Sequence, residues 1–359
     1  MEKNTNQLSF STISVSRRKL KSEFFDQMNL LLDWTAIDSE IRKHYSKGFS
    51  VAGRPSYSGL LLFKISLLQT WYGLSDYEVE EKVNDSLSFM KFVGLTLEDD
   101  VPDHSVLSRF RTELTQKDAY EKLMGTINGQ LEEKGVLLKK GAIVDASITD
   151  SPRKPRGRKA YEVTEDRKEE AGLAAAEQQP DPQAVPAVKI QSHVDQQGAW
   201  IKKAGKLRFG YKKHMATDDQ GLIRAVITTP ANESDMLHLE DVVKKAGIDK
   251  GSRVRADKGY SSAGNRESLK SNGLKDGIMY KAVRNKPLTG HQQKFNKIVS
   301  QTRFKVERTF AGITRWFKTG IARYLGKSKT HTQHLMEAIA YNLYRSPGIV
   351  VSNAVLTIK

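Results

Sequence analysis

Three carboxylate residues lie where a purely structural role would not place them. Asp145 stands inside an apolar run at 143–146, Asp257 ends a short strand-like segment at 253–257, and Glu307 borders an apolar helical stripe. A carboxylate beside a core needs a partner, because burying it without one is costly. Three carboxylates that meet at a sheet edge would find that partner in a hard divalent cation, since Mg²⁺ prefers oxygen ligands.

This set of residue types indicates phosphodiester chemistry. Two divalent cations about 3.5–4 Å apart can activate an attacking oxygen and stabilise a leaving one. Each carboxylate alone is weak evidence, because an aspartate on a strand is more often a cap or an ion-pair partner. The hypothesis rests on their joint placement. Asp150 is a lesser alternative ligand to Asp145, although its place before Ser151-Pro152 favours a turn.

The charge balance favours a polyanionic partner. Lys and Arg number 58 against 42 Asp and Glu, which gives a net charge of +16. Nucleic acid is favoured over acidic lipid, because no basic amphipathic helix with an aromatic face stands out. A basic protein that is merely soluble is the alternative. No apolar run is long enough to predict a transmembrane helix, so no membrane partner is expected.

Cysteine is absent from the sequence, which excludes disulfides, thiolate metal sites and cysteine nucleophiles. The first residues also lack the basic-then-apolar pattern of a signal peptide. Both observations favour a cytoplasmic protein.

Residues 1–135 are expected to form a helical N-terminal domain. Apolar residues recur at helical spacing over 24–34 and 60–71, and Ser75 with Glu78 predicts a capping box. A further helix is expected to open at 103–105, with Arg109 and Arg111 on its outer face. Such short helices suit a helix-turn-helix-like DNA-binding unit, and a helical packing module with solvated arginines is an equally good interpretation.

Residues 136–345 are expected to form an α/β domain, a mixed sheet flanked by helices. Residues 151–190 are predicted to be a disordered insert, because their composition cannot bury a core, and 346–359 a C-terminal tail. The expected strands are 142–148, 207–217, 222–229, 253–257 and 277–283. The expected helices are 233–246, 261–272, one through Val306, Phe310, Ile313 and Phe317, and 331–345, with a polar loop at 284–296.

Several segments together resemble the DDE transposases of bacterial insertion sequences, specifically the group called insertion-sequence family five. They are Ile143-Val144-Asp145-Ala146-Ser147, Gly210-Tyr211-Lys212-Lys213-His214, Thr229-Pro230-Ala231-Asn232-Glu233-Ser234-Asp235, Ala256-Asp257-Lys258-Gly259-Tyr260 and Arg303-Phe304-Lys305-Val306-Glu307-Arg308-Thr309-Phe310. Upstream, Gly53-Arg54-Pro55 and the stretch from Asp103 to Arg111 resemble the N-terminal helical domain of the same group. The resemblance spans roughly residues 50 to 345.

The resemblance implies an RNase H-like fold and a metal site made of Asp145, Asp257 and Glu307, which would bind two Mg²⁺ or Mn²⁺ ions. It implies cleavage of double-stranded DNA at terminal inverted repeats and joining of the 3′-hydroxyl ends to target DNA. It also implies a dimer on paired DNA ends and a nucleoid-associated protein in a bacterial cytoplasm. A metal-dependent nuclease without strand transfer, or a catalytically silent DNA-binding relative, are the alternatives.

Six basic residues are candidates for DNA contact. Related elements carry Tyr, Arg, Glu and Lys along the last catalytic helix, and here Arg303 holds the Arg place, four residues before Glu307. Ser300 and Thr314 stand in the Tyr and Lys places, and Arg315 is a substitute for the missing lysine. The other candidates are Arg308, Lys258, Arg109 and Arg111, of which Lys258 and Arg308 could instead only offset the carboxylates.

Overall fold

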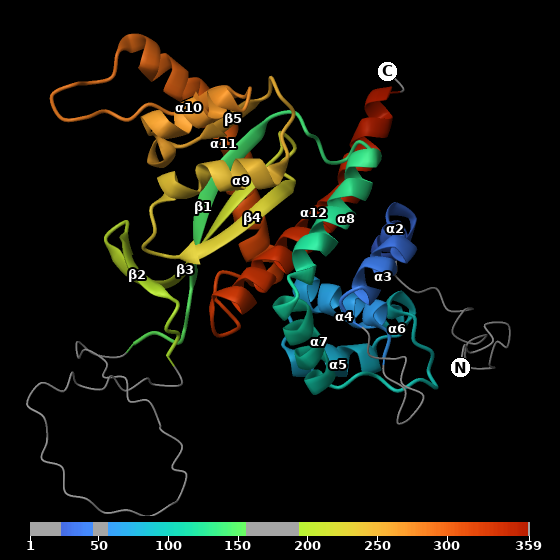
Figure 1. Cartoon of the computed structure of the whole chain (residues 1–359). Coiled ribbons are helices and arrows are strands. Elements are labelled where there is room, and N and C mark those ends of the chain that lie inside the picture. The colour runs from blue at the N-terminus through green and yellow to red at the C-terminus, as the bar shows by residue number, and fades with distance from the viewer. Residues whose placement is uncertain (1–22, 46–56, 156–193, 358–359) are drawn as a thin grey trace, which may run out of the picture.

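The computed structural model describes residues 23–45, 57–155 and 194–357. Its N-terminal part is helical, with the elements grouped on one side of the molecule (Figure 1). They are α2 (Glu23–Leu31), α3 (Trp34–Arg42), α4 (Gly59–Tyr72), α5 (Asp76–Asp85), α6 (Leu87–Val93), α7 (His104–Gln116) and α8 (Ala119–Glu133). The motif at 53–55 and most of the expected insert lie outside the described residues.

Local capping sets the boundaries of these helices. Ser75 and Glu78 form the predicted capping box at the start of α5, and Gly73 ends α4 in the left-handed region at φ 64°. Asp103 caps α7 by accepting from the amide of Val106. The single helix expected over 24–34 is wrong: Asp33 accepts from the amide of Thr35 and starts a second helix there.

A mixed sheet forms the second part of the molecule. Its strands are β1 (Ala142–Asp150), β2 (Ala199–Lys203), β3 (Lys206–Thr217), β4 (Ile223–Pro230), β5 (Arg253–Ala256) and β6 (Lys275–Ile278). The strand order is β2-β3-β1-β5-β6, and β4 also pairs with β3. The pairs β1–β3, β2–β3 and β3–β4 are antiparallel, whereas β1–β5 and β5–β6 are parallel. The expected α/β class is confirmed, and the order agrees with the RNase H-like fold that the resemblance implies.

Helices cover the sheet, and two of them differ from expectation. The elements are η1 (Asp235–His238), α9 (Leu239–Ala246), η2 (Lys258–Tyr260), α10 (Ala263–Ser271), α11 (Gly290–Phe317) and α12 (Lys327–Thr357). The polar loop expected at 284–296 is wrong in its second half, because Thr289 and Gln292 form a capping box that starts α11. The stretch expected as a tail from 346 is helical as far as Thr357.

The helical part and the sheet part share one apolar core. Buried side chains of α4, α7 and α8 are continuous with Met215 and Val226 of the sheet and with the inner face of α12. The indole of Trp71 on α4 donates to the carbonyl of Ala340 on α12 at 2.9 Å. Within the described residues, no helix is both long and apolar enough to cross a membrane.

Candidate active site

Strand register brings the two aspartates together. Val144 of β1 lies opposite Ala256 of β5 in the parallel pair, so the next residues along the two strands are Asp145 and Asp257. Neighbouring strands are about 4.8 Å apart, which leaves these carboxylates within electrostatic reach of each other. Asp145 also lies opposite Met215 of β3, and it therefore occupies the middle of the sheet.

The Asp145 carboxylate is mostly buried and paired. Its side chain is 16% exposed, and its Oδ2 accepts from Arg303 Nη2 at 2.7 Å. Its Oδ1 accepts from the amide of Ala146 at 2.8 Å. Burial raises the pKa of Asp145 above its usual value, Arg303 lowers it, and the nearby charge of Asp257 raises it again.

Arg303 lies beside two of the three carboxylates. It comes from α11, which packs against β1 and β5, and its Nη2 lies 3.7 Å from Oε1 of Glu307, one helical turn further on. Burial lowers the pKa of Arg303, but Asp145, Asp257 and Glu307 together raise it above its ordinary value. Because α11 crosses beside both strands, Arg303 pairs with Asp145 and Glu307 and also feels the charge of Asp257.

The turn that carries Asp257 is tightly built. Its Oδ1 accepts from the amide of Gly259 at 2.6 Å. A Cβ atom on residue 259 would lie 2.8 Å from the same oxygen, so only glycine leaves room for the carboxylate. Behind the turn, the buried Tyr260 hydroxyl lies 3.4 Å from His214 Nδ1 on β3, which anchors the turn to the sheet.

His214 packs in the core of the sheet part. It is fully buried, and its Nε2 lies 3.1 Å from the Thr229 hydroxyl. Burial lowers its pKa to about 4, so the ring is neutral at pH 7. Its neighbour Lys212 is also buried and donates to Asp235 Oδ1 at 2.8 Å.

This Lys212–Asp235 pair next to Tyr260 was not predicted. Asp235 is one of the charges that, after burial, raise the pKa of Tyr260. The sequence carried a signal for it, since the adjacent Lys212 and Lys213 stand in a strand-like segment that also holds Phe209, Tyr211 and Met215.

The donor set fits a divalent cation. All three groups are carboxylates, which are hard oxygen ligands, and two of them already share one positive group. Arg303 Nε is buried without a hydrogen-bond partner among the described residues, so its guanidinium is not fully satisfied there. In that part of the chain, no group of three or more acidic or histidine side chains is already arranged to hold a metal ion.

Comparison with known proteins identifies the family. A family model described as a transposase DDE domain matches residues 139–343, and one described as a transposase domain (DUF772) matches residues 13–113. The chain belongs to the DDE transposase family. The first match covers more than half of the chain and includes all three carboxylates, and membership implies a requirement for a divalent metal.

A curated relative supports the same conclusion. The transposase for insertion sequence element IS1106 of Neisseria meningitidis serogroup B is 39% identical over 240 residues, which is 66% of this chain and 76% of the relative. Solved structures are more distant. A piggyBac transposase synaptic complex with hairpin DNA has a TM-score of 0.41 at 9% identity, covering 93% of this chain and 74% of the other. A Mos1 transposase paired-end complex has a TM-score of 0.21 at 9% identity, covering 84% and 81%.

The basic residues expected to contact DNA fall into two groups. Lys258, Arg308, Arg315 and Arg109 of the transposase are exposed, as phosphate contacts require. Arg303 is instead engaged with Asp145.

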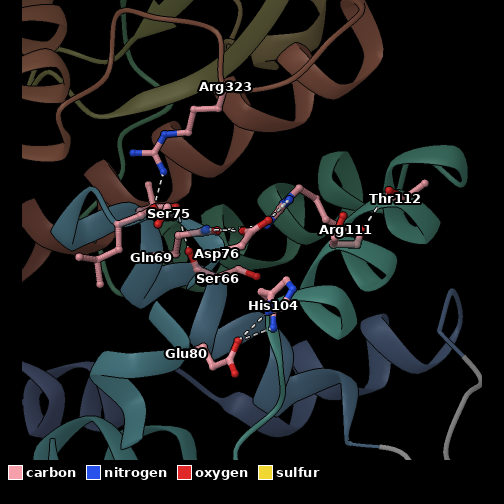
Figure 2. Close-up of polar contacts among 12 residues, drawn as sticks. Ser66, Gln69, Ser75, Asp76, Glu80, His104, Arg111, Thr112 and Arg323 are labelled. Carbon is pink, nitrogen blue, oxygen red and sulfur yellow. Dashed lines mark hydrogen bonds and ion pairs between the residues drawn. The ribbon is translucent and has the colours of Figure 1, made fainter. Parts of the chain in front are cut away.

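Arg111 was expected on the outer face of α7, but the structure buries it. It is 7% exposed, donates to Gln69 at 3.3 Å and forms an ion pair with Asp76 (Figure 2). Its guanidinium also lies 4.5 Å over the ring of Tyr324. Arg111 therefore joins α7 to α5 and to the segment before α12. We do not expect it to contact DNA.

Asp150, the alternative ligand, lies away from the triad. It ends β1, five residues after Asp145 and on the opposite face of the strand. Both of its oxygens accept from Arg208, at 2.8 and 2.7 Å. Asp150 is therefore an ion-pair partner at the base of the β2–β3 hairpin.

Proposed function

We propose that this transposase binds the terminal inverted repeats of its insertion sequence, cleaves the DNA at their ends and joins the freed 3′-hydroxyls to target DNA. Asp145, Asp257 and Glu307 are the proposed ligands of two Mg²⁺ or Mn²⁺ ions. The observation that carries the proposal is that Arg303 of α11 pairs with Asp145 of β1 and with Glu307, while the parallel register of β1 and β5 places Asp257 next to Asp145. No single one of these elements would make a site.

The charge of this cluster explains why it suits phosphate chemistry. Cations held by the three carboxylates would supply Lewis-acid activation of the attacking oxygen and neutralise charge on the leaving one. Burial raises the pKa of Asp145, and the charge of Arg303 lowers it, so Arg303 favours the ionised carboxylate that a metal ligand needs. The sheet holds both aspartates rigidly, and the helix supplies Glu307 from the solvent side, where its side chain is 60% exposed.

The surrounding basic residues would hold the DNA. Lys258 follows Asp257 directly, and Arg308 and Arg315 lie on α11 beyond Glu307. Lysine and arginine contacts to phosphate position a duplex without reading its sequence. Arg109 on α7 is the corresponding candidate in the helical part, where a helix-turn-helix-like role remains our proposal. Transposition joins two ends, so we also propose a dimer on paired DNA ends.

The proposal is tested by cleavage of linear DNA carrying the ends of the element, with Mg²⁺, with Mn²⁺ and with chelator. Asp145→Asn and Glu307→Gln should lose cleavage and keep binding, because each removes one ligand charge without changing size. Glu267→Gln on α10 is the matched control, since Glu267 is exposed and lies outside the cluster. It should cleave like the wild type.

Each outcome separates the alternatives. Metal-dependent nicking at the repeat boundary, followed by joining to a second duplex, supports the full proposal. Nicking without joining identifies a nuclease. Specific binding without cutting in any metal identifies a DNA-binding relative. Retained cleavage by Asp145→Asn would refute the ligand assignment.

A further inference from the structure

A two-stranded arm extends beyond the end of the sheet. The residues of β3 from 210 onward pair with β1, whereas residues 206–210 pair with β2. The arm, residues 199–208, projects from the body of the molecule (Figure 1). All side chains from Lys202 to Leu207 are exposed.

The arm carries uncompensated positive charge. Lys203 lies opposite Lys206 at the turn, and Lys202 lies on the other face of the ribbon, opposite Leu207. None of the three lysines forms an ion pair with any described residue. Like charges that face each other across a ribbon are destabilising, so these lysines do not serve the stability of the hairpin. Their placement indicates an anionic partner.

One face of the arm is also apolar. Trp200 is 40% exposed and packs on Phe209 with ring centroids 5.1 Å apart, and Leu207 on the same face is 65% exposed. An exposed tryptophan and leucine beside a lysine suit the wall of a nucleic-acid groove, where sugars and base edges are apolar and phosphates lie at the rim.

The arm is held in one conformation. Its turn residues Ala204 and Gly205 have φ of 50° and 77°, as the two-residue turn of a tight hairpin requires. At its base, the Arg208 guanidinium donates hydrogen bonds to both carboxylate oxygens of Asp150 on β1. Gly210 has φ 151°, and a Cβ there would lie 2.2 Å from the carbonyl of Thr149, so the strands cross too closely for any other residue. A rigid arm loses little entropy on binding.

We propose that this hairpin is a DNA-contacting arm that lies in a groove of the duplex and holds phosphates of both strands with Lys202, Lys203 and Lys206. The inference rests on the proposed function, since it needs a DNA partner. A two-stranded ribbon fits the major groove, which is about 12 Å wide. Charge favours DNA over a second protein copy, because a second copy of this chain is itself strongly basic.

The reach of the arm sets where it binds. Met215 lies opposite Asp145, and the turn of Ala204 and Gly205 lies just before Lys206, the first residue of β3. At about 3.3 Å per residue, the tip is on the order of 35 Å from Asp145. One turn of B-DNA is about 34–36 Å. The arm therefore touches the duplex about one helical turn from the phosphate that is cut.

The test compares the wild type with the triple variant Lys202→Gln, Lys203→Gln, Lys206→Gln. Each phosphate contact contributes about 0.9 to the slope of log affinity against log salt, so the triple variant should lower that slope by about 2 to 3. Hydroxyl-radical footprinting should show the loss of protection about one turn from the cut. Shortening the duplex below that distance should weaken wild-type binding and leave the variant unchanged.

A second triple variant, Lys244→Gln, Lys250→Gln, Lys270→Gln on the α9–α10 surface, matches the change in net charge. Equal losses in both variants, or an unchanged slope and footprint in the first, would overturn the proposal. A change in sedimentation without a change in slope would assign the arm to a second protein copy instead.

If the wild type neither binds nor cuts element ends, the proposed function itself fails. If the wild type binds and cuts element ends and the triple variant of the arm does so equally well, only the DNA-contacting role of the arm is wrong.

Discussion

Arg303 donates to Asp145 at 2.7 Å and lies 3.7 Å from Glu307, so one guanidinium bridges two of the three proposed metal ligands. A positive group among converging carboxylates offsets their repulsion. We expect Arg303→Gln to lower the free energy of unfolding by about 1–3 kcal/mol without metal, because it leaves buried charge unpaired. Added Mg²⁺ should restore more stability to the variant than to the wild type.

Urea unfolding with and without Mg²⁺ measures this effect. Arg308→Gln is the control, because Arg308 is exposed on the same helix and should change stability by no more than about 0.5 kcal/mol. If Mg²⁺ did not change the free energy of unfolding of Arg303→Gln, that result would argue against a cation site at these carboxylates.

Gly259 should matter more for activity than for folding. A Cβ on residue 259 would press on Asp257 Oδ1 from 2.8 Å. A displacement of about 1 Å at a catalytic group can cost roughly 100-fold in rate, so Gly259→Ala should reduce cleavage by about 10- to 100-fold. The melting temperature should stay close to that of the wild type.

Gly264→Ala provides the comparison for this variant. A Cβ on Gly264 in α10 meets nothing within 4 Å, so cleavage should be unchanged. Wild-type rates in Gly259→Ala would show that the Asp257 carboxylate tolerates displacement, and the argument from close approach would be wrong.

Arg111 should act on stability and not on DNA affinity. It is buried and paired with Asp76, and breaking a buried pair is strongly destabilising. Since Asp76 is 25% exposed, we expect Arg111→Met to cost about 2–4 kcal/mol, below the full effect of a dry pair. At temperatures where Arg111→Met is folded, its slope of log DNA affinity against log salt should equal that of the wild type.

Arg109→Met should show the opposite pattern, with unchanged stability and a shallower salt slope. Chemical unfolding and binding titrations on the same two variants separate the roles. A reduced slope in folded Arg111→Met would return it to the DNA-contacting set.

His334 predicts a loss of stability in acid. It lies between the hydroxyls of Thr149 and Thr228, 2.9 and 2.7 Å from its ring nitrogens. Burial, then the charges of Lys213 and His331, holds its pKa well below the ordinary value. The unfolded chain therefore binds a proton that the folded chain does not. Stability contributed this way is present above about pH 6.5 and is lost as the pH falls below it.

Unfolding free energies measured from pH 7.5 to pH 5 test this prediction. His334→Gln should have a shallower slope below pH 6.5 than the wild type, by up to about 1.4 kcal/mol per pH unit. His291→Gln, at an exposed histidine, should follow the wild type. Parallel slopes in His334→Gln and the wild type would mean that His334 takes up its proton normally.

Sequence patterns predicted the helices and strands better than they predicted the contacts between side chains of different elements. The capping box of Ser75 and Glu78 and the strands that carry Asp145 and Asp257 depend on residues close in the chain, and all of them are present. The start of α11 at Gly290 was missed because its first turns are polar and only the Thr289–Gln292 capping box marks them.

Long-range partners explain the other errors. Arg111 lies four residues after Leu107 and three before Leu114, on the buried face of α7, but its neutralising partners are on α5 and beside α12. Similarly, the place of Arg303 could be read from the sequence, whereas its pairing with Asp145 depends on how α11 crosses the sheet. Such contacts depend on the fold and have no local signal.

The shared core makes α12 indispensable to both halves of the molecule. Its inner face closes the sheet part and the helical part together, and its backbone receives the indole of Trp71. A gene copy interrupted before the codon for Lys327 would therefore yield a polypeptide in which the apolar face that each half packs against α12 is uncovered. Such defective copies should be cleared by proteolysis and should not accumulate as stable inhibitors that compete with the intact protein.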